Sequence, residues 1–199
     1  LRAIDTLTCW LKDDYAMKLG SEGNDSINLI RSNVEKMDTL IKGILDYSTI
    51  SEVKTDFYEV DTDSLIEDII SLMLPPPNIS IVKLAVLPVI RGDRYRLQQL
   101  FQNLIDNAIK YNDKATGLIE IGVENGKGFW TFFIKDNGKG IDEIYFDKIF
   151  KTFQKLENNP QSTGIGLSIV KKIVTLYGGR IWVQSELNVG TTFFFTIKK

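Results

Sequence analysis

Three short blocks rich in asparagine and glycine constrain the fold of this chain more than any other feature. They are Asn103–Tyr111 within a strongly patterned helical segment, Asp136–Ile141 after an apolar strand, and Gly164–Ser168 at the start of a helix. One such block alone is weak support for a pocket, because short glycine-rich strings arise by chance in many proteins. Three of them in this order, each at a junction between regular elements, predict one pocket shared by two helices and a strand end.

The segments around the blocks predict helices and strands in a mixed order. Apolar residues recur at helical spacing in some segments and alternate in others, which separates the two kinds of element. The expected helices cover 61–74, 94–111 and 164–177, and the expected strands cover 57–60, 79–84, 89–90, 118–124, 130–136, 180–185 and 191–197. Helices segregated from a mixed sheet indicate an α/β sandwich over residues 57–199, within an α+β chain.

Residues 1–53 predict a separate helical hairpin. A helix over 1–19 and a longer helix over 26–51 each carry an apolar stripe, and a turn over 20–25 joins them. Two helices cannot cover both stripes alone, so a dimeric four-helix bundle is the economical solution. Packing of the stripes on the rest of the chain is the alternative.

Composition narrows the class of protein. Of 199 residues, 43% are hydrophobic and 25% are charged, which is ordinary for a globular protein, and a net charge of -2 argues against nucleic acid as a partner. No apolar run approaches the roughly 20 residues that cross a bilayer. The single cysteine, Cys9, excludes an internal disulfide and suits the cytoplasm. We expect membrane contact, if there is any, only through a region upstream of Leu1.

The first block places four polar side chains on one helix face. Asn103, Asn107, Lys110 and Tyr111 are spaced i, i+4, i+7 and i+8, apart from the apolar stripe of the same helix. An asparagine oxygen is a hard, neutral ligand that Mg²⁺ accepts beside waters and phosphate oxygens, and a lysine neutralises phosphate charge. A solvated polar face explains this pattern equally well when it is taken alone.

The other two blocks supply the remaining parts of a nucleotide site. Asp136 ends a strand and can accept a hydrogen bond from an exocyclic amine such as that of adenine, with Gly138 and Gly140 allowing close approach. Gly164 and Gly166 open a helix whose free N–H groups suit phosphate. Alone, each block reads as an ordinary turn or a tight helix–sheet contact. Together, the three blocks predict a site for Mg²⁺ and ATP.

These blocks resemble the N, G1 and G2 boxes of the GHKL superfamily, and most closely those of sensor histidine kinases attached to phytochromes and PAS sensors. Residues 146–156 resemble the F box of that family, and residues 190–192 resemble its G3 element. The resemblance implies that 57–199 is the catalytic ATP-binding domain. It implies that 1–53 is most of the dimerisation and histidine-phosphotransfer hairpin, without the acceptor histidine.

The resemblance also implies roles for individual residues. Asn107 would be the principal Mg²⁺ ligand, with Asn103 beside it. The catalytic residues would be Asn103, Asn107 and Lys110. Residues 146–163 would form a mobile lid. The residues implied to contact the nucleotide are Asn103, Asn107, Lys110, Tyr111, Asp136, Gly138, Gly140, Ile141, Thr163, Gly164, Ile165, Gly166, Leu167 and Thr192.

The expected reaction is transfer of the γ-phosphoryl group from Mg·ATP to a histidine, followed by relay to an aspartate of a response-regulator receiver domain. GHKL hydrolases carry a general-base glutamate at the position of Asn103, and an amide cannot take a proton from water. The chain contains no histidine. The acceptor would stand six residues before Leu1, which leaves truncation or natural loss as explanations. A nucleotide-binding pseudokinase and a GHKL-type ATPase remain the alternatives.

Overall fold

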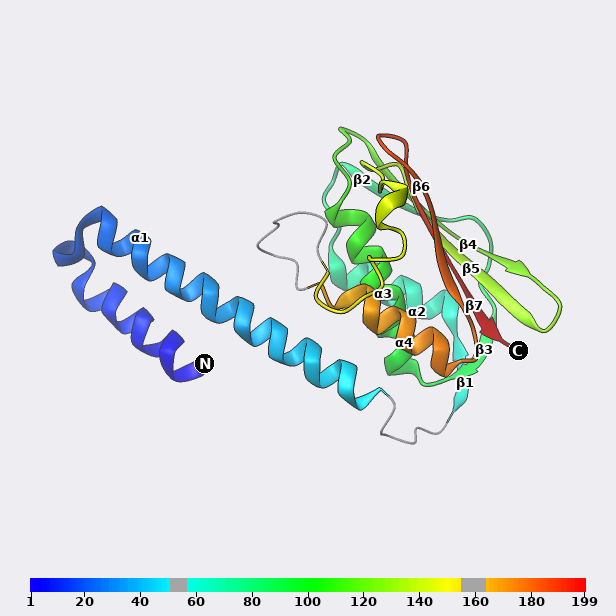
Figure 1. Ribbon diagram of the computed structural model, residues 1–199, viewed down its shortest axis with the longest axis horizontal. Coiled ribbons are helices and arrows are strands. Elements are labelled where there is room, and N and C mark those ends of the chain that lie inside the picture. Colours follow the sequence, from blue (N-terminus) through cyan, green and yellow to red (C-terminus); the bar gives the residue numbers. More distant parts are fainter. Residues whose placement is uncertain (51–56, 155–163) are drawn as a thin grey trace.

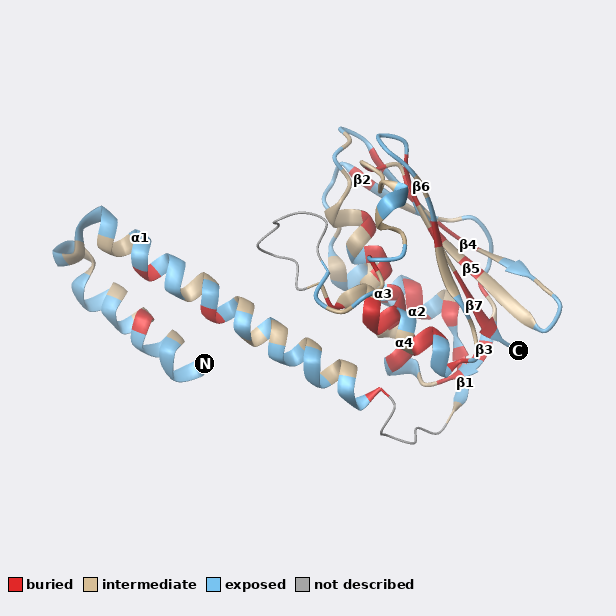
Figure 2. Ribbon diagram, viewed as in Figure 1, coloured by how far each residue is buried: buried red, intermediate tan, exposed pale blue. Residues whose placement is uncertain are grey.

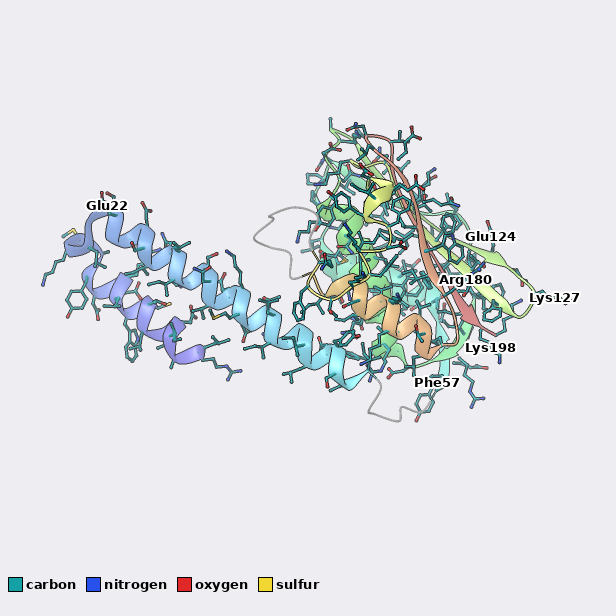
Figure 3. All side chains as sticks on the ribbon, in the orientation of Figure 1. Glu22, Phe57, Glu124, Lys127, Arg180 and Lys198 are labelled. Carbon is teal, nitrogen blue, oxygen red and sulfur yellow. The ribbon has the colours of Figure 1, made fainter. Side chains whose placement is uncertain are left out.

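The computed structural model describes residues 1–50, 57–154 and 164–199 of the chain. A long helical arm extends from a sandwich of helices and strands (Figure 1). Glu22 lies at the tip of the arm and Lys127 lies at the opposite end of the molecule (Figure 3).

The arm is α1 (Arg2–Thr49), which Gly20 divides into two antiparallel helical segments (Figure 1). Gly20 has φ 64° and ψ −171°, and the Asn24 side chain donates to the carbonyls of Ala16 and Gly20. The Arg31 side chain pairs with Asp5 across the two segments at 3.3 Å. The turn expected over 20–25 is therefore wrong in its extent, because one glycine with positive φ reverses the chain and the helix resumes directly after it.

The main sheet has five strands in the order β2-β4-β5-β7-β6. These strands are β2 (Ile79–Lys83), β4 (Gly117–Asn125), β5 (Phe129–Asp136), β6 (Ile181–Glu186) and β7 (Gly190–Lys198). β2 runs parallel to β4 and the other neighbours are antiparallel, which gives the expected mixed sheet. β1 (Tyr58–Asp61) and β3 (Val89–Gly92) form a separate antiparallel pair.

The helices α2 (Thr62–Met73), α3 (Arg94–Lys110) and α4 (Gly166–Leu176) cover one face of the sheet, and buried residues lie between these two layers (Figure 2). Phe101 of α3 packs edge-on against Phe132 and Phe195 of the sheet, with ring centroids 5.5 Å apart in both pairs. This two-layer packing confirms the α/β sandwich. A short 3₁₀ helix, η1 (Glu143–Tyr145), was not expected from the sequence.

Helix caps set the start of α3. The Asp93 carboxylate accepts the backbone N–H groups of Tyr95 and Arg96, which fixes where the helix begins and so which residues share each face. α3 ends at Lys110, one residue before the expected end. α4 begins at Gly166 rather than at Gly164, because Gly164 has φ 71° and its carbonyl accepts the N–H of Phe153.

The second segment of α1 ends against the sandwich. Gly43 lies against Ile165, since a Cβ at Gly43 would stand 3.0 Å from the Ile165 side chain. Farther along, Arg96 donates to the Thr49 carbonyl at 2.9 Å, and Ile50 is buried. Most of the apolar stripe of α1 is nevertheless exposed in the single chain, so packing on the sandwich does not cover it.

Within the ranges that the structure describes, no helix combines the length and the apolar character needed to cross a membrane.

Candidate functional site

A cavity of about 450 Å³ opens between α3, the end of β5, the turn after it and the start of α4. Its lining residues are Thr39, Asn103, Asp106, Asn107, Lys110, Tyr111, Asp136, Lys139, Gly140, Ile141, Asp142, Tyr145, Ile149, Gln154, Gly164, Gly166, Leu167, Leu187, Thr191 and Phe193. All three sequence blocks therefore contribute to one cavity, as their order along the chain predicts.

The polar face of α3 forms one wall. Asn103, Asn107, Lys110 and Tyr111 all line the cavity, whereas the apolar stripe of the same helix is buried in the core. The Asn103 amide donates to the Gln99 carbonyl at 2.7 Å, which holds its side chain along the helix. A Cβ at position 166 would stand 2.7 Å from the Asn103 oxygen, so Gly166 allows α3 and α4 to approach each other here.

Asp136 is a buried carboxyl group in the cavity wall. Its Oδ1 accepts the N–H of Gly138 at 2.8 Å and the N–H of Thr191 at 3.3 Å. Burial raises the pKa of Asp136 to about 6, and these two hydrogen bonds offset part of that rise. Both of these protein donors bind the same oxygen, Oδ1.

The turn after Asp136 depends on glycine at two positions. A Cβ at Gly138 would stand 2.7 Å from the Tyr111 carbonyl oxygen, and one at Gly140 would stand 2.0 Å from the Glu186 carbonyl oxygen. Gly140 also has φ 74°, a conformation that side chains disfavour. Gly140 and Ile141 line the cavity, whereas Gly138 acts through the hydrogen bond that it donates to Asp136.

The start of α4 contributes Gly164, Gly166 and Leu167 to the cavity. The Ile165 side chain does not line it, because that side chain is buried against α1. The hydroxyl of Ser168 is buried and donates to the Ile165 carbonyl at 2.7 Å. Thr163 lies outside the described residues.

Thr191, rather than Thr192, faces the cavity. Successive residues of a strand point to opposite faces of the sheet, and β7 presents Thr191 and Phe193 to the cavity. Thr192 is paired with Lys135 and Gln184 on its two neighbouring strands, on the face away from the helices. The inclusion of Thr192 is therefore corrected to Thr191, which also donates its N–H to Asp136.

Further lining residues were not predicted from the sequence, for different reasons. Lys139 stands inside the second block, and its Nζ lies 4.9 Å from the centre of the Tyr111 ring, which is also 5.8 Å from the Nζ of Lys110. Its position between two glycines was an available signal. Asp106, which precedes Asn107, was also overlooked. Thr39 comes from α1, and no local pattern places it here.

Phe150 and Phe153, in the expected lid, differ in environment. Phe150 packs edge-on against Phe193 with ring centroids 6.2 Å apart, whereas Phe153 is exposed. Gln154, the last described residue before 164, lines the cavity. The remainder of the expected lid, 155–163, falls outside the described residues.

The oxygen ligands of the cavity suit a hard cation only when a bound nucleotide supplies further oxygen ligands to the same ion. Among the described residues, no group of three or more histidine, cysteine, aspartate or glutamate side chains could hold a metal ion by itself. Asn103 and Asn107 present neutral amide groups on one helix face, and Mg²⁺ takes such oxygens together with waters and phosphate oxygens. The residues therefore fit Mg²⁺ that arrives with a nucleotide.

The mixed sheet covered on one face by helices, with a polar cavity at the helix–strand junctions, has the architecture of histidine kinase-like ATP-binding domains. The chain belongs to the histidine kinase-, DNA gyrase B- and HSP90-like ATPase family, whose model matches residues 92–199. The resemblance stated from the three blocks is thereby confirmed.

Individual proteins show the same likeness. The chain is 35% identical over its whole length to cyanobacterial phytochrome B of Nostoc sp., of which the match covers 27%. It spans about a quarter of the length of the curated relatives that it matches first. The solved catalytic domain of the histidine kinase ThkA is 30% identical, with a TM-score of 0.63 over 73% of this chain and 97% of that one.

A second solved structure also includes the arm. Histidine kinase ThkA in complex with the response regulator protein TrrA matches 98% of this chain and 58% of that chain, at 25% identity and a TM-score of 0.70. The match thus includes nearly all of α1 together with the sandwich.

Proposed function

We propose that this chain is the kinase core of a two-component sensor, which binds Mg·ATP and donates its γ-phosphoryl group to a histidine for relay to a receiver-domain aspartate. The observation that carries the proposal is the single cavity that joins the Asp136 carboxyl to the polar face of α3. Family membership and the histidine kinase relatives support it.

The nucleotide would lie across the cavity with its two ends held by different elements. Asp136 would accept the exocyclic amine of adenine through Oδ2. Lys110 and Lys139, whose ammonium groups lie 5.8 Å and 4.9 Å from the centre of the Tyr111 ring, would neutralise phosphate charge. The first N–H groups of α4, which have no partner within the helix, would bind phosphate oxygens.

Asn107 and Asn103 would hold Mg²⁺, which would screen phosphate charge and orient the γ-phosphoryl group for in-line attack. Neither amide can deprotonate a water molecule, so Asn103 and Asn107 would position a phosphoryl donor without activating a nucleophile. The nucleophile would be a protein side chain, the histidine expected upstream of Leu1.

Phosphoryl transfer to a separate acceptor tests the proposal. The chain is incubated with γ-labelled ATP and a purified helical hairpin that carries the acceptor histidine. We expect label on that hairpin, loss of label with Asp136→Asn, and no change with Lys127→Ala, which lies at the far end of the molecule (Figure 3). An unlabelled acceptor despite measured ATP binding would leave a pseudokinase as the better description.

A second function, ATP hydrolysis, is favoured by one observation. The carboxyl group of Asp106 lines the same cavity, one residue before Asn107. As a carboxylate it could take a proton from water where Asn103 cannot. Steady phosphate release that survives Asn103→Ala and is abolished by Asp106→Asn would establish an ATPase.

The partners follow from the same proposal. Residues 1–53 would form a homodimer through α1, and a response-regulator receiver domain would dock on that hairpin. The solved complex of ThkA with TrrA supports such a pairing for a related kinase. We place the chain in the cytoplasm, where ATP is available.

A further inference from the structure

Two asparagines outside the cavity join the end of α3 to the turn that follows Asp136. The Asn112 amide donates to Oδ1 of Asn137 at 2.9 Å. The same Oδ1 accepts the N–H of Leu118 at 2.8 Å, and the Asn137 amide donates to the Thr116 carbonyl at 3.1 Å. Neither asparagine lines the cavity.

The polarity of this amide pair is fixed by its surroundings. Turning the Asn137 amide over would deprive the Leu118 N–H of its acceptor and the Thr116 carbonyl of its donor. Asn112 already uses its oxygen to accept the N–H of Lys114 at 3.1 Å. Asn112 must therefore present a donor and Asn137 an acceptor.

Backbone contacts beside the pair bring the same two segments together. The N–H of Lys139 donates to the Tyr111 carbonyl at 3.4 Å, and Gly138 has no room for a Cβ against that carbonyl. Gly117 likewise leaves space for Asn112, since a Cβ there would stand 2.9 Å from Ile79 and 3.1 Å from the Asn112 side chain. These contacts form a seam between residues 111–112 and residues 137–139. The hydrogen bond between the Asn112 and Asn137 amides is the side-chain link across this seam.

The seam joins the two ends of the proposed nucleotide site. On one side lie Lys110 and Tyr111, the last residues of the polar α3 face. On the other side lies Asp136, whose Oδ1 is held by the N–H of Gly138 next to Asn137. Movement along the seam would change the distance between the carboxyl group and the α3 face.

We propose that Asn112 and Asn137 are positioning residues that set the place of Asp136 relative to α3 and thereby determine the selectivity of the site for an adenine base. This inference rests on the proposed function, because it assumes that Asp136 accepts the adenine amine. It assigns a role in base recognition to two residues that do not touch the base.

The test compares binding of ATP with binding of inosine triphosphate, which has a carbonyl oxygen where adenine has the amine. Asn112→Asp is nearly isosteric, but it sets an acceptor against the Asn137 oxygen. We expect ATP affinity to fall about three- to tenfold, while the affinity for inosine triphosphate changes little, so that the ratio of the two affinities falls. Asn112→Ser keeps a donor hydroxyl and should retain most of the ratio.

Calorimetric titration of the full chain with both nucleotides, together with a melting temperature for each variant, separates positioning from stability. If Asn112→Asp lowers the melting temperature but leaves the affinity ratio unchanged, the pair is only structural and the inference is wrong. If Asn112→Asp does not fold, Asn112→Ala deletes the donor without adding charge and gives the same comparison.

Asp136→Asn makes the two failures distinguishable. One outcome is that Asp136→Asn abolishes the preference for ATP over inosine triphosphate while Asn112→Asp leaves that preference unchanged. This outcome overturns the inference and leaves the proposed function standing. An unchanged ratio in Asp136→Asn removes Asp136 from the adenine site, and both fall together.

Discussion

Asp136 shows how one residue sets the conditions under which the proposed site works. An ionised carboxyl group only accepts hydrogen bonds, whereas a protonated one also carries a donor. Burial raises the pKa of Asp136 to about 6, so folding disfavours the charged form relative to the unfolded chain. The folded chain therefore holds this proton more tightly than the unfolded chain. The stabilising contribution is complete below the unfolded pKa and is lost as pH rises through about 6.

Binding of ATP should follow the opposite direction with pH. We expect the affinity for ATP to increase as pH rises through about 6, because ionised Asp136 is a stronger acceptor for the adenine amine than the neutral carboxyl group. Titration calorimetry between pH 5 and pH 8, a range set by that pKa, measures the effect. ATP itself titrates nearby, so Asp136→Asn serves as the control and should lack the increase due to the protein. Equal pH profiles in both proteins would contradict the assignment.

Gly140 illustrates a residue whose side chain is excluded by geometry. With φ 74° and only 2.0 Å between a built Cβ and the Glu186 carbonyl oxygen, Gly140→Ala should lower the free energy of unfolding by about 2–4 kcal/mol. The matched control is Gly128→Ala, which shares a positive φ of 80° but meets nothing within 4 Å. It should cost about 1–2 kcal/mol. Urea denaturation of both variants measures the difference in the free energy of unfolding. Equal decreases in the two variants would contradict the prediction, because they would show that the backbone around residue 140 moves to accommodate the added Cβ.

At the scale of elements, the end of α1 is capped by the sandwich. The last turn of α1 has no basic residue, so its terminal carbonyls lack a cation from the helix itself. Lys172 of α4 donates to the Tyr47 carbonyl at 2.5 Å and lies 4.3 Å from the centre of the Tyr47 ring, and Arg96 of α3 donates to the Thr49 carbonyl. Two helices that carry the cavity thus hold the C-terminus of the arm.

Removing one of these cations should loosen the end of α1. Lys172→Met keeps the side-chain stem but deletes the donor and the charge, so amide exchange over residues 40–49 should accelerate about fivefold to tenfold. Lys171→Met makes the same chemical change at the neighbouring exposed position and should leave that exchange unchanged. Acceleration in both variants would indicate a loss of general charge rather than of the cap.

How well each element could be predicted depends on whether its determinants are local. α3 was predicted to within a residue, because Asp93 caps it and its apolar stripe has a regular period. The start of α4 was placed too early, since Gly164 is held outside the helix by a hydrogen bond from Phe153, a residue 11 positions earlier in the chain. The 3₁₀ turn η1 has too few residues to show a period.

The site residues also differ in whether local sequence could predict them. Residues within the three blocks were found because chemistry and spacing coincide along a short stretch. Thr39, which reaches the cavity from α1, and Asn112, which pairs across the seam with Asn137, depend on tertiary contacts that no local pattern records. The choice between Thr191 and Thr192 required the register of β7, because a shift of one residue reverses the face of a strand.

At the scale of the whole molecule, the arm presents apolar side chains that the sandwich does not cover. Exposed members on the two antiparallel segments are Leu1, Ile4, Leu7, Leu11, Tyr15, Ile30, Met37, Ile41, Ile44 and Leu45. Within each segment they recur at helical spacing, so each forms a stripe rather than scattered positions. Exposed apolar stripes of this extent favour association, and a second copy of the same hairpin would complete a four-helix core.

Self-association through α1 is therefore expected, with a mass in light scattering of twice 22.6 kDa. Ile41→Glu places a charge within the stripe and should raise the dissociation constant of the dimer by about tenfold or more, because a charge at such an interface is desolvated without a partner. Met17→Glu makes the same kind of change at a fully exposed position outside the stripes and should leave the dimer intact. A parent chain that stays monomeric, or equal weakening by both substitutions, would show that the stripes meet some other surface. ATP affinity should be the same in the two variants, since neither residue lines the cavity, and a loss confined to Ile41→Glu would instead link dimerisation to nucleotide binding.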